Sequence, residues 1–468
     1  MADARAVFLE GNLFRHISVM ALTSSVGLVA VFLVDFIDMV FIAMLGKAEL
    51  AAAIGYAGAI LFFTTSFGIG MAIAAGALVA RALGSGDEGL ARARAAAALV
   101  WGVVFSAIFA ALVWVNLETL ARLIGASGAT LDLTVDYLAI IVPSLPFLIV
   151  GMIGGAILRA HGDARRAMMA TIYGALVNLV LDPILIFGLG LELTGAAMAS
   201  VAARLAIAAT GLLPIFRYHG GLAMPGPAAL ASALPPIVTI AGPAILTQLA
   251  TPVGQAYITR AMAAYGEAAV AGMAIITRLT PVAFGVIFAL SGAIGPIIGQ
   301  NFGAGESDRV RRAYRDGMLF CGIYVLVATI ALYALRGPLA ALFDADGITR
   351  DLLFLFCGPL ALAFFFNGAI FVSNAACNNM GYPFRSTLVN WGRHTIGIVP
   401  FVAIGGALYG APGVLIGQAV GGVLFAGIAA LVVNRIMDGH GAAAPLQDGV
   451  PSAYRPQVRL MSLFDHRR

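Results

Sequence analysis

The sequence predicts an all-α integral membrane protein, with twelve transmembrane helices in two pseudo-symmetric six-helix bundles. Its composition, its long apolar segments and an internal repeat each support this fold class. The chain has 468 residues, of which 61% are hydrophobic and 11% charged, whereas soluble domains carry about 25% charged residues. A soluble fold of this size could not bury so much apolar surface. The 56 glycines suit closely packed membrane helices.

The apolar segments end at glycine, proline or charged residues. They exceed the roughly 20 residues that span the hydrocarbon core and are too long for barrel strands of about 10 residues. We expect spans at 15–45, 48–82, 88–120, 130–158, 164–190, 194–217, 233–265, 267–302, 307–336, 349–379, 383–408 and 411–436.

The two halves of the chain repeat. LGKAELAAAIG at 45–55 matches YGEAAVAGMAI at 265–275, and ARALGSGDEGLARARA at 80–95 matches GQNFGAGESDRVRRA at 299–313. Because each half has an even number of spans, the halves run in the same sense, related by an axis along the membrane normal. We therefore predict an N-terminal bundle at 1–217, a cytoplasmic linker at 218–232, a C-terminal bundle at 233–436 and a cytoplasmic tail at 437–468.

Arginine is concentrated in alternate loops, which predicts orientation by the positive-inside rule. With the N-terminus inside, most loop arginines are cytoplasmic, whereas the opposite loops hold Lys47, Arg122, Arg260, Arg336 and Arg350. The first residues lack a short apolar core followed by a cleavage site, so we interpret them as a retained lead-in. We expect a multi-pass protein of the plasma (inner) membrane with both termini cytoplasmic.

Three carboxylates stand inside predicted spans of the first half. Asp35 and Asp38 share a helix face, displaced by about 4.5 Å along the axis. Asp38 precedes Gly46, and Asp182 precedes Gly190, by the same number of residues. Both acids should therefore lie about 12 Å from the outer face, where they can meet. Asn178 shares the face of Asp182, and Pro183 should loosen the helix after it.

Clustered carboxylates in a low dielectric cannot all ionise cheaply. Such a cluster takes up a proton, or binds a cation that replaces one, which suits a coupling-ion site. The alternative is structural: each acid is satisfied by a backbone kink or by an arginine at depth, with Arg204, Arg278 and Arg393 as the candidates.

The second half offers neutral polar stripes in place of acids. Thr247, Thr251, Gln255 and Thr259 recur every four residues, and Phe364 precedes a stripe formed by Asn367, Asn374 and Asn378. These side chains either join helices by hydrogen bonds or line a wet cleft. His394, beside Arg393, is either a proton relay or a hydrogen-bonded structural residue.

Other function classes lack their motifs. The segments GSGDEG at 84–89 and GAGESD at 303–308 have no P-loop lysine and no preceding strand. The three cysteines, Cys321, Cys357 and Cys377, show no metal-ligand spacing. The charge of +4 reflects membrane topology and gives no support for nucleic-acid binding. We expect no enzyme, no cofactor and no metal site, except that Na⁺ could occupy Asp38 and Asp182.

Several segments of the chain together resemble a known family. The segments FIDMVFIAMLG, ARALGSGDEGLARA and NLVLDPILIFGLGLELTGAAMAS, in this order, resemble the multidrug and toxic compound extrusion (MATE) transporters. The resemblance covers roughly residues 15–436. It implies two six-helix bundles around a central cleft, and export of organic cations and amphiphilic drugs in exchange for H⁺ or Na⁺.

The resemblance also implies roles for particular residues. Asp38 matches the acid of the first helix, and Asn178 and Asp182 match the pair of the DinF-like branch. Tyr137, Ser200 and Arg393 match further polar positions of the family, while Asp35 is an additional acid. Thr23 stands where many members have a proline, although the repeat keeps Pro243.

The predicted function is an alternating-access antiporter that exports organic cations or amphiphiles in exchange for H⁺ or Na⁺, and we expect a monomer. One alternative is a flippase for a lipid-linked precursor, which would need a strongly cationic cavity. Another is a membrane-embedded enzyme, which would need His, Asp or Glu clustered near one face.

Overall fold

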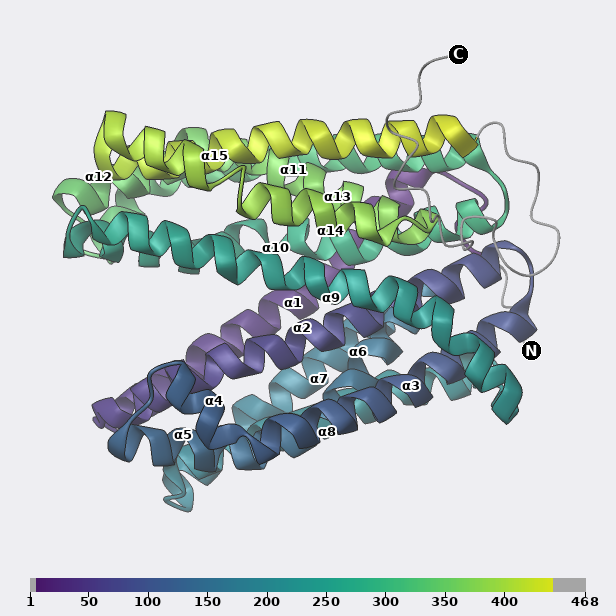
Figure 1. The fold of residues 1–468 in the computed structure, drawn as a ribbon, viewed down its shortest axis with the longest axis horizontal. Coiled ribbons are helices and arrows are strands. Elements are labelled where there is room, and N and C mark those ends of the chain that lie inside the picture. The colour runs from purple at the N-terminus through teal and green to yellow at the C-terminus, as the bar shows by residue number, and fades with distance from the viewer. Residues whose placement is uncertain (1–5, 441–468) are drawn as a thin grey trace, which may run out of the picture.

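A computed structural model describes residues 6–440, and all regular structure in that range is helical (Figure 1). The N bundle contains α1 (Leu13–Met44), α2 (Ala48–Gly84), α3 (Glu88–Val115), α4 (Leu117–Leu123), α5 (Gly128–Ile141), α6 (Leu145–Ala160), α7 (Ala164–Pro183) and α8 (Glu192–Tyr218). The C bundle contains α9 (Pro227–Ala263), α10 (Glu267–Gly303), α11 (Ser307–Leu342), α12 (Gly347–Leu355), α13 (Ala361–Met380), α14 (Pro383–His394) and α15 (Val399–His440). Short 3-10 or π-helical turns connect α5 to α6, follow α7, and connect α12 to α13.

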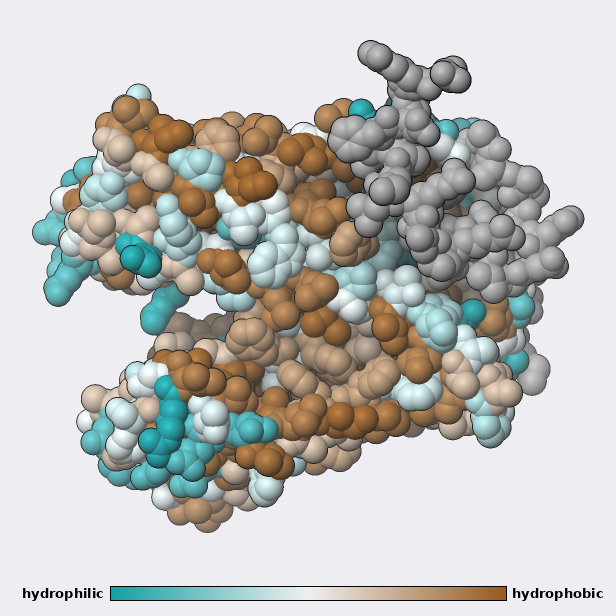
Figure 2. All heavy atoms as spheres, in the orientation of Figure 1, coloured by the Kyte–Doolittle hydropathy of each residue, from teal (hydrophilic) through white to brown (hydrophobic). Residues whose placement is uncertain are grey.

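The two bundles form a V. They meet at the end that carries the start of α1 and diverge toward the end that carries α4, α5 and α12 (Figure 1). Figure 2 shows the resulting notch between the bundles, and large apolar side chains over much of the visible surface. We call the two ends the closed end and the open end.

The described residues contain eleven continuous stretches long and apolar enough to cross a membrane. The last, Pro383–Gly439, makes two passes, because α15 folds back at Gly410, where φ is +64° and ψ is −145°. Its arms pack so closely that a Cβ on Gly421 would lie 1.6 Å from the carbonyl oxygen of Gly397. The predicted all-α fold with twelve spans is therefore confirmed, and the protein is a multi-pass membrane protein.

The first helix of each half packs against both bundles. At the closed end, Leu13 and Ile17 of α1 belong to the apolar core of the C bundle. At the open end, Ile42 of α1 packs with Leu50 of α2. In the second half, the early part of α9 (Ile237) lies in the core of the N bundle, and its late part (Ile258) in that of the C bundle.

The element boundaries differ from the sequence prediction mainly near the linker. We expected a polar linker at 218–232, but α8 ends at Tyr218 and α9 already begins at Pro227. Pro227 stands at the start of the helix, where its missing N–H costs nothing. The connection is therefore 219–226. At the C-terminus α15 continues to His440, and the rest of the predicted tail lies outside the described residues.

Candidate functional site

The predicted acids of α1 and α7 come together through one amide. Asn178 Nδ2 donates to Asp182 Oδ2 at 2.6 Å, and lies 3.3 and 3.4 Å from the two carboxylate oxygens of Asp38. Asp38 and Asp182 also lie close enough to interact directly. Asp182 is fully buried, Asp38 half-buried, and Asp35 exposed one turn away on α1.

Local sequence features bring these helices together. Gly27 of α1 faces Met168 and Thr171 of α7, so the helices approach closely. Directly after Asp182, α7 ends at Pro183 and the chain continues as a π-helical turn, Ile184–Gly188. The loosening predicted at Pro183 is thus present, and it ends the regular helix beside the buried carboxylate.

Helices α5 and α8 bring further polar groups to this site. The hydroxyl of Tyr137 lies near Ser200, Asp38 and Asp182. Arg204 is close to Tyr137, and its Nη1 donates to Ile141 O at 3.0 Å and to Ser144 Oγ at 2.9 Å. Arg204 is thus bonded to the break between α5 and α6.

The hydrogen bonding around Asp182 is incomplete. Its Oδ2 accepts from Asn178, but its buried Oδ1 has no hydrogen-bond partner among the described residues. A buried carboxylate oxygen without a donor is costly. A proton on one of the two acids, or a bound cation, would remove this cost, so the arrangement suits reversible ion binding.

The second-half stripes divide between buried and accessible positions. Thr247 is buried and lies 3.0 Å from Thr387 Oγ1 of α14, while the Oδ1 of buried Asn378 accepts from Ser386 at 3.3 Å. Both side chains join helices within the C bundle. Thr251 is exposed and Gln255 half-buried on α9.

The remaining predicted residues of the C bundle lie on α13 and α14. Phe364 stacks on Phe284, with ring centroids 4.0 Å apart. Arg393 donates to Asn367, and Asn390 Nδ2 donates to Asn374 Oδ1 at 3.0 Å. The ring stack joins α13 to α10, whereas the two polar contacts tie α13 to α14 and would be lost if those two helices separated.

His394 and Pro243 contribute to the packing of α9 against α14. His394 is buried, and its Nδ1 has no hydrogen-bond partner among the described residues. That nitrogen lies against Gly254, where a Cβ would be 2.3 Å away. The carbonyl oxygen of Pro243 accepts from Thr247 Oγ1 at 2.9 Å and from Thr387 Oγ1 at 2.7 Å.

In the structural alternative, each acid is satisfied by a backbone kink or by an arginine. Within residues 6–440, no ion pair joins Asp38 or Asp182 to arginine. Arg204 and Arg393 are hydrogen-bonded to other groups instead. The same range contains no group of three His, Cys, Asp or Glu residues suited to a metal ion.

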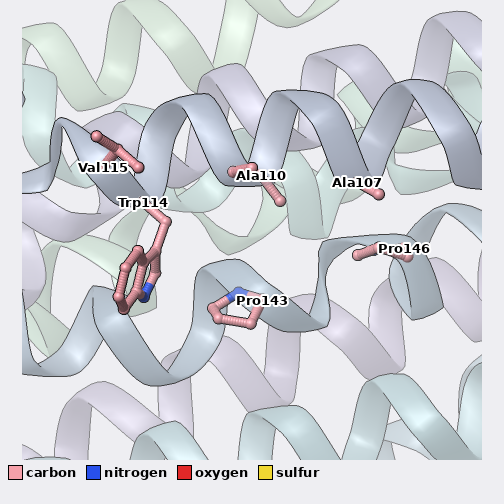
Figure 3. Close-up of a pocket in the computed structure, with 7 residues that line it drawn as sticks. Ala107, Ala110, Trp114, Val115, Pro143 and Pro146 are labelled. Carbon is pink, nitrogen blue, oxygen red and sulfur yellow. The ribbon is translucent and has the colours of Figure 1, made fainter.

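A separate groove of about 310 Å³ lies between α3 and the break from α5 to α6 (Figure 3). Its lining is apolar, with Trp114 facing Pro143 across it. None of the predicted site residues lines this groove.

Comparison with known proteins agrees with the fold and with the repeat. The MatE family profile matches residues 24–184 and again residues 243–403. A protein named "FAD transporter" from Shewanella oneidensis is 30% identical over 418 residues, covering 87% of this chain and 91% of that protein. The multidrug export protein MepA of Staphylococcus aureus is 24% identical over 445 residues, covering 94% and 97%.

Solved structures share the architecture. The Vibrio cholerae MATE transporter VcmN, crystallised as its D35N mutant, superposes with a TM-score of 0.87 at 23% identity, covering 91% of this chain and 97% of that one. An outward-facing multidrug resistance MATE transporter superposes with a TM-score of 0.87 at 20% identity, covering 93% and 98%. With the profile matched in both halves, this chain belongs to the MATE family and is a membrane transporter, not an enzyme.

Proposed function

We propose that this transporter is an antiporter that exports organic cations or amphiphilic drugs in exchange for H⁺, with Na⁺ as the alternative coupling ion. The observation that carries the proposal is the shared amide of Asn178 between Asp38 and Asp182. Two acids held together with one unsatisfied oxygen favour uptake of one positive charge. The name of the MepA relative supports drug export.

The roles of individual residues follow from their positions. Asp38 and Asp182 bind the coupling ion, Asn178 holds both acids, and Tyr137 and Ser200 complete the polar wall. Asp35, exposed on α1, is a third acid, one turn from Asp38 toward the closed end. Thr251, Gln255, Asn367 and Asn374 are the C-bundle residues that we assign to the substrate cleft.

The orientation is also part of the proposal. Because most loop arginines lie at the closed end, that end is cytoplasmic by the positive-inside rule. The notch of Figure 2 would then open to the outside of the inner membrane, as required for substrate release. Alternating access requires a second state in which the closed end opens. We propose that the monomer is the functional unit.

The test uses the full-length protein in liposomes with a fluorescent organic cation, under H⁺ and Na⁺ gradients imposed separately. Asp38→Asn and Asp182→Asn should each abolish gradient-driven transport while the protein remains folded. Asp132→Asn, which changes an exposed acid on α5, is the matched control and should transport normally. Full transport by both site variants would refute the assignment.

A second substrate class is included in the same assay. The relative named "FAD transporter" favours a flavin dinucleotide. Uptake of FAD with no uptake of the cation would replace the proposed substrate while leaving the coupling site intact.

A further inference from the structure

At the closed end, the last turns of α2 and α10 touch through two glycines. A Cβ on Gly84 would lie 2.0 Å from the carbonyl oxygen of Gln300, and a Cβ on Gly303 would lie 2.2 Å from that of Arg81. Real Cβ atoms do not approach backbone oxygens so closely. The two contacts are reciprocal, since the repeat alignment of 80–95 with 299–313 pairs Gly84 with Gly303 and Arg81 with Gln300.

The side chains of Arg81 and Gln300 are reciprocal as well. Arg81, in the N bundle, donates to the carbonyl oxygens of Asn378 and Asn379 at the end of α13, both at 2.7 Å. Gln300, in the C bundle, donates through Nε2 to Ala160 O at the end of α6, at 2.8 Å. Each side chain therefore caps a helix of the opposite bundle.

The Gln300 side chain also binds a third segment of the chain through its acceptor oxygen. Its Oε1 accepts the backbone N–H of Phe8 at 2.9 Å. The carbonyl oxygen of Phe8 accepts from Asn301 Nδ2 at 3.1 Å and from Arg309 Nη2 at 2.9 Å. Three side chains of α10 and α11 thus hold one residue of the segment before α1.

The Phe8 side chain fills the space behind these bonds. It is 1% exposed, packs edge-on against His16 with ring centroids 5.4 Å apart, and lies beside Gly162 in the turn between α6 and α7. The segment Ala6–Asn12 therefore contacts both bundles where they meet. Its last residue, Asn12, is the N-cap of α1, the helix that carries Asp38.

We propose that Ala6–Asn12 is a latch: bound to Gln300, Asn301 and Arg309, it holds the closed end shut, and it must leave before that end can open. This inference rests on the proposed alternating access and orientation. Because the latch continues directly into α1, any movement of α1 at the coupling site reaches the latch through one helix.

The test measures the distance between the bundles at the closed end and needs no transport. Spin labels are attached at Glu88 and Asp308, which are exposed in the first turns of α3 and α11, after Cys321, Cys357 and Cys377 are replaced by alanine. Phe8→Ala removes the buried ring, and Arg309→Gln removes one anchor of the Phe8 carbonyl while keeping the ring. Val19→Ala is the matched control, because Val19 lies on α1 outside the latch and is 55% exposed.

We expect the unsubstituted protein to show mainly the short distance. Phe8→Ala and Arg309→Gln should move most of the population to a longer distance, and Val19→Ala should leave it unchanged. Gly84→Ala serves as the opening control, since its Cβ cannot fit the closed contact. The proposal is overturned if Gly84→Ala lengthens the distance while both latch variants leave it unchanged.

Should Phe8→Ala fail to fold, Arg309→Gln alone decides between these results. If the distances change as expected but the protein transports no cation in liposomes, the latch proposal stands and the proposed function is refuted.

Discussion

Asp38 and Asp182, on different helices, are held by the same nitrogen atom, Nδ2 of Asn178. The amide is the uncharged member of the group, and it holds the two carboxylates next to each other. Because Asn178 and Asp182 both lie on α7, separation of α1 from α7 breaks the contacts to Asp38 and leaves the one to Asp182 in place. The coupling site is therefore also a joint between the two helices.

The first prediction concerns this amide. Asn178→Leu keeps the approximate volume but removes the shared donor, and hydrogen bonds to charged groups contribute about 1.5–3 kcal/mol each. We expect gradient-driven transport to fall by about tenfold or more, since about 1.4 kcal/mol corresponds to a factor of ten. Initial rates in liposomes measure this. Transport within a factor of two of the unsubstituted protein would contradict the role of Asn178.

The second prediction concerns the glycine contact at the closed end. Gly84→Ala places a Cβ against Gln300 O, and overpacking of this kind costs about 1–3 kcal/mol. Because the contact exists only while the bundles meet, the cost falls on the closed state rather than on either bundle. We expect transport to fall about tenfold with little change in thermal stability. Gly58→Ala, on the same helix with open space around it, should behave normally.

The third prediction concerns Asp163, in the turn between α6 and α7. Burial would raise the pKa of this carboxyl, but hydrogen bonds from His219 and Arg166 outweigh burial and hold the pKa at about 2. Because the folded pKa lies below the ordinary 3.8, the carboxylate stabilises the protein above pH 3.8, and this stability is lost as the pH falls toward 2. Asp163→Asn should cost about 1–2 kcal/mol at pH 7.

The neighbouring His161 makes the stability of the fold depend on pH at higher pH values as well. Burial, together with the nearby His219, lowers the pKa of His161 to about 4 from the ordinary 6.5. The unfolded chain therefore takes up this proton first, and stability falls as the pH drops from 6.5 to 4. His161→Gln should make the thermal unfolding temperature less dependent on pH over that range. An unchanged slope would show that the pKa of His161 is the same in the folded and the unfolded protein.

The fourth prediction concerns orientation. Glu267, the first residue of α10, and Glu306, in the turn that follows its last residue, are both exposed and lie at opposite ends of this helix. In intact cells, a membrane-impermeant thiol reagent should label Glu267→Cys and reach Glu306→Cys only after permeabilisation. The native cysteines are buried and give a low background. The reverse labelling pattern would place the termini outside.

The apolar segments predicted twelve spans because membrane helices must satisfy their backbone internally, so segment length alone identifies them. The shared depth of Asp38 and Asp182 was predictable for a similar reason, since helical rise converts residue counts into distance. The start of α9 was not, because a polar, proline-rich segment is compatible with either a linker or a helix until packing decides.

The contacts at the closed end were also beyond prediction. Gln300 and Phe8 are nearly three hundred residues apart in the sequence. Nothing in the sequence around an apolar residue before the first span indicates which distant residue it contacts. The neutral residues of the second half were ambiguous for another reason. Thr247 and Thr251 belong to one stripe, yet only the neighbouring α14 buries the first and leaves the second exposed.

The crossing of α1 and α9 has a consequence for the independence of the two halves. Each half places the beginning of its first helix in the core of the other half. A half expressed alone would lack the partner core that packs the beginning of this helix. Two copies of one half could restore that packing only by exchanging first helices, as in domain swapping.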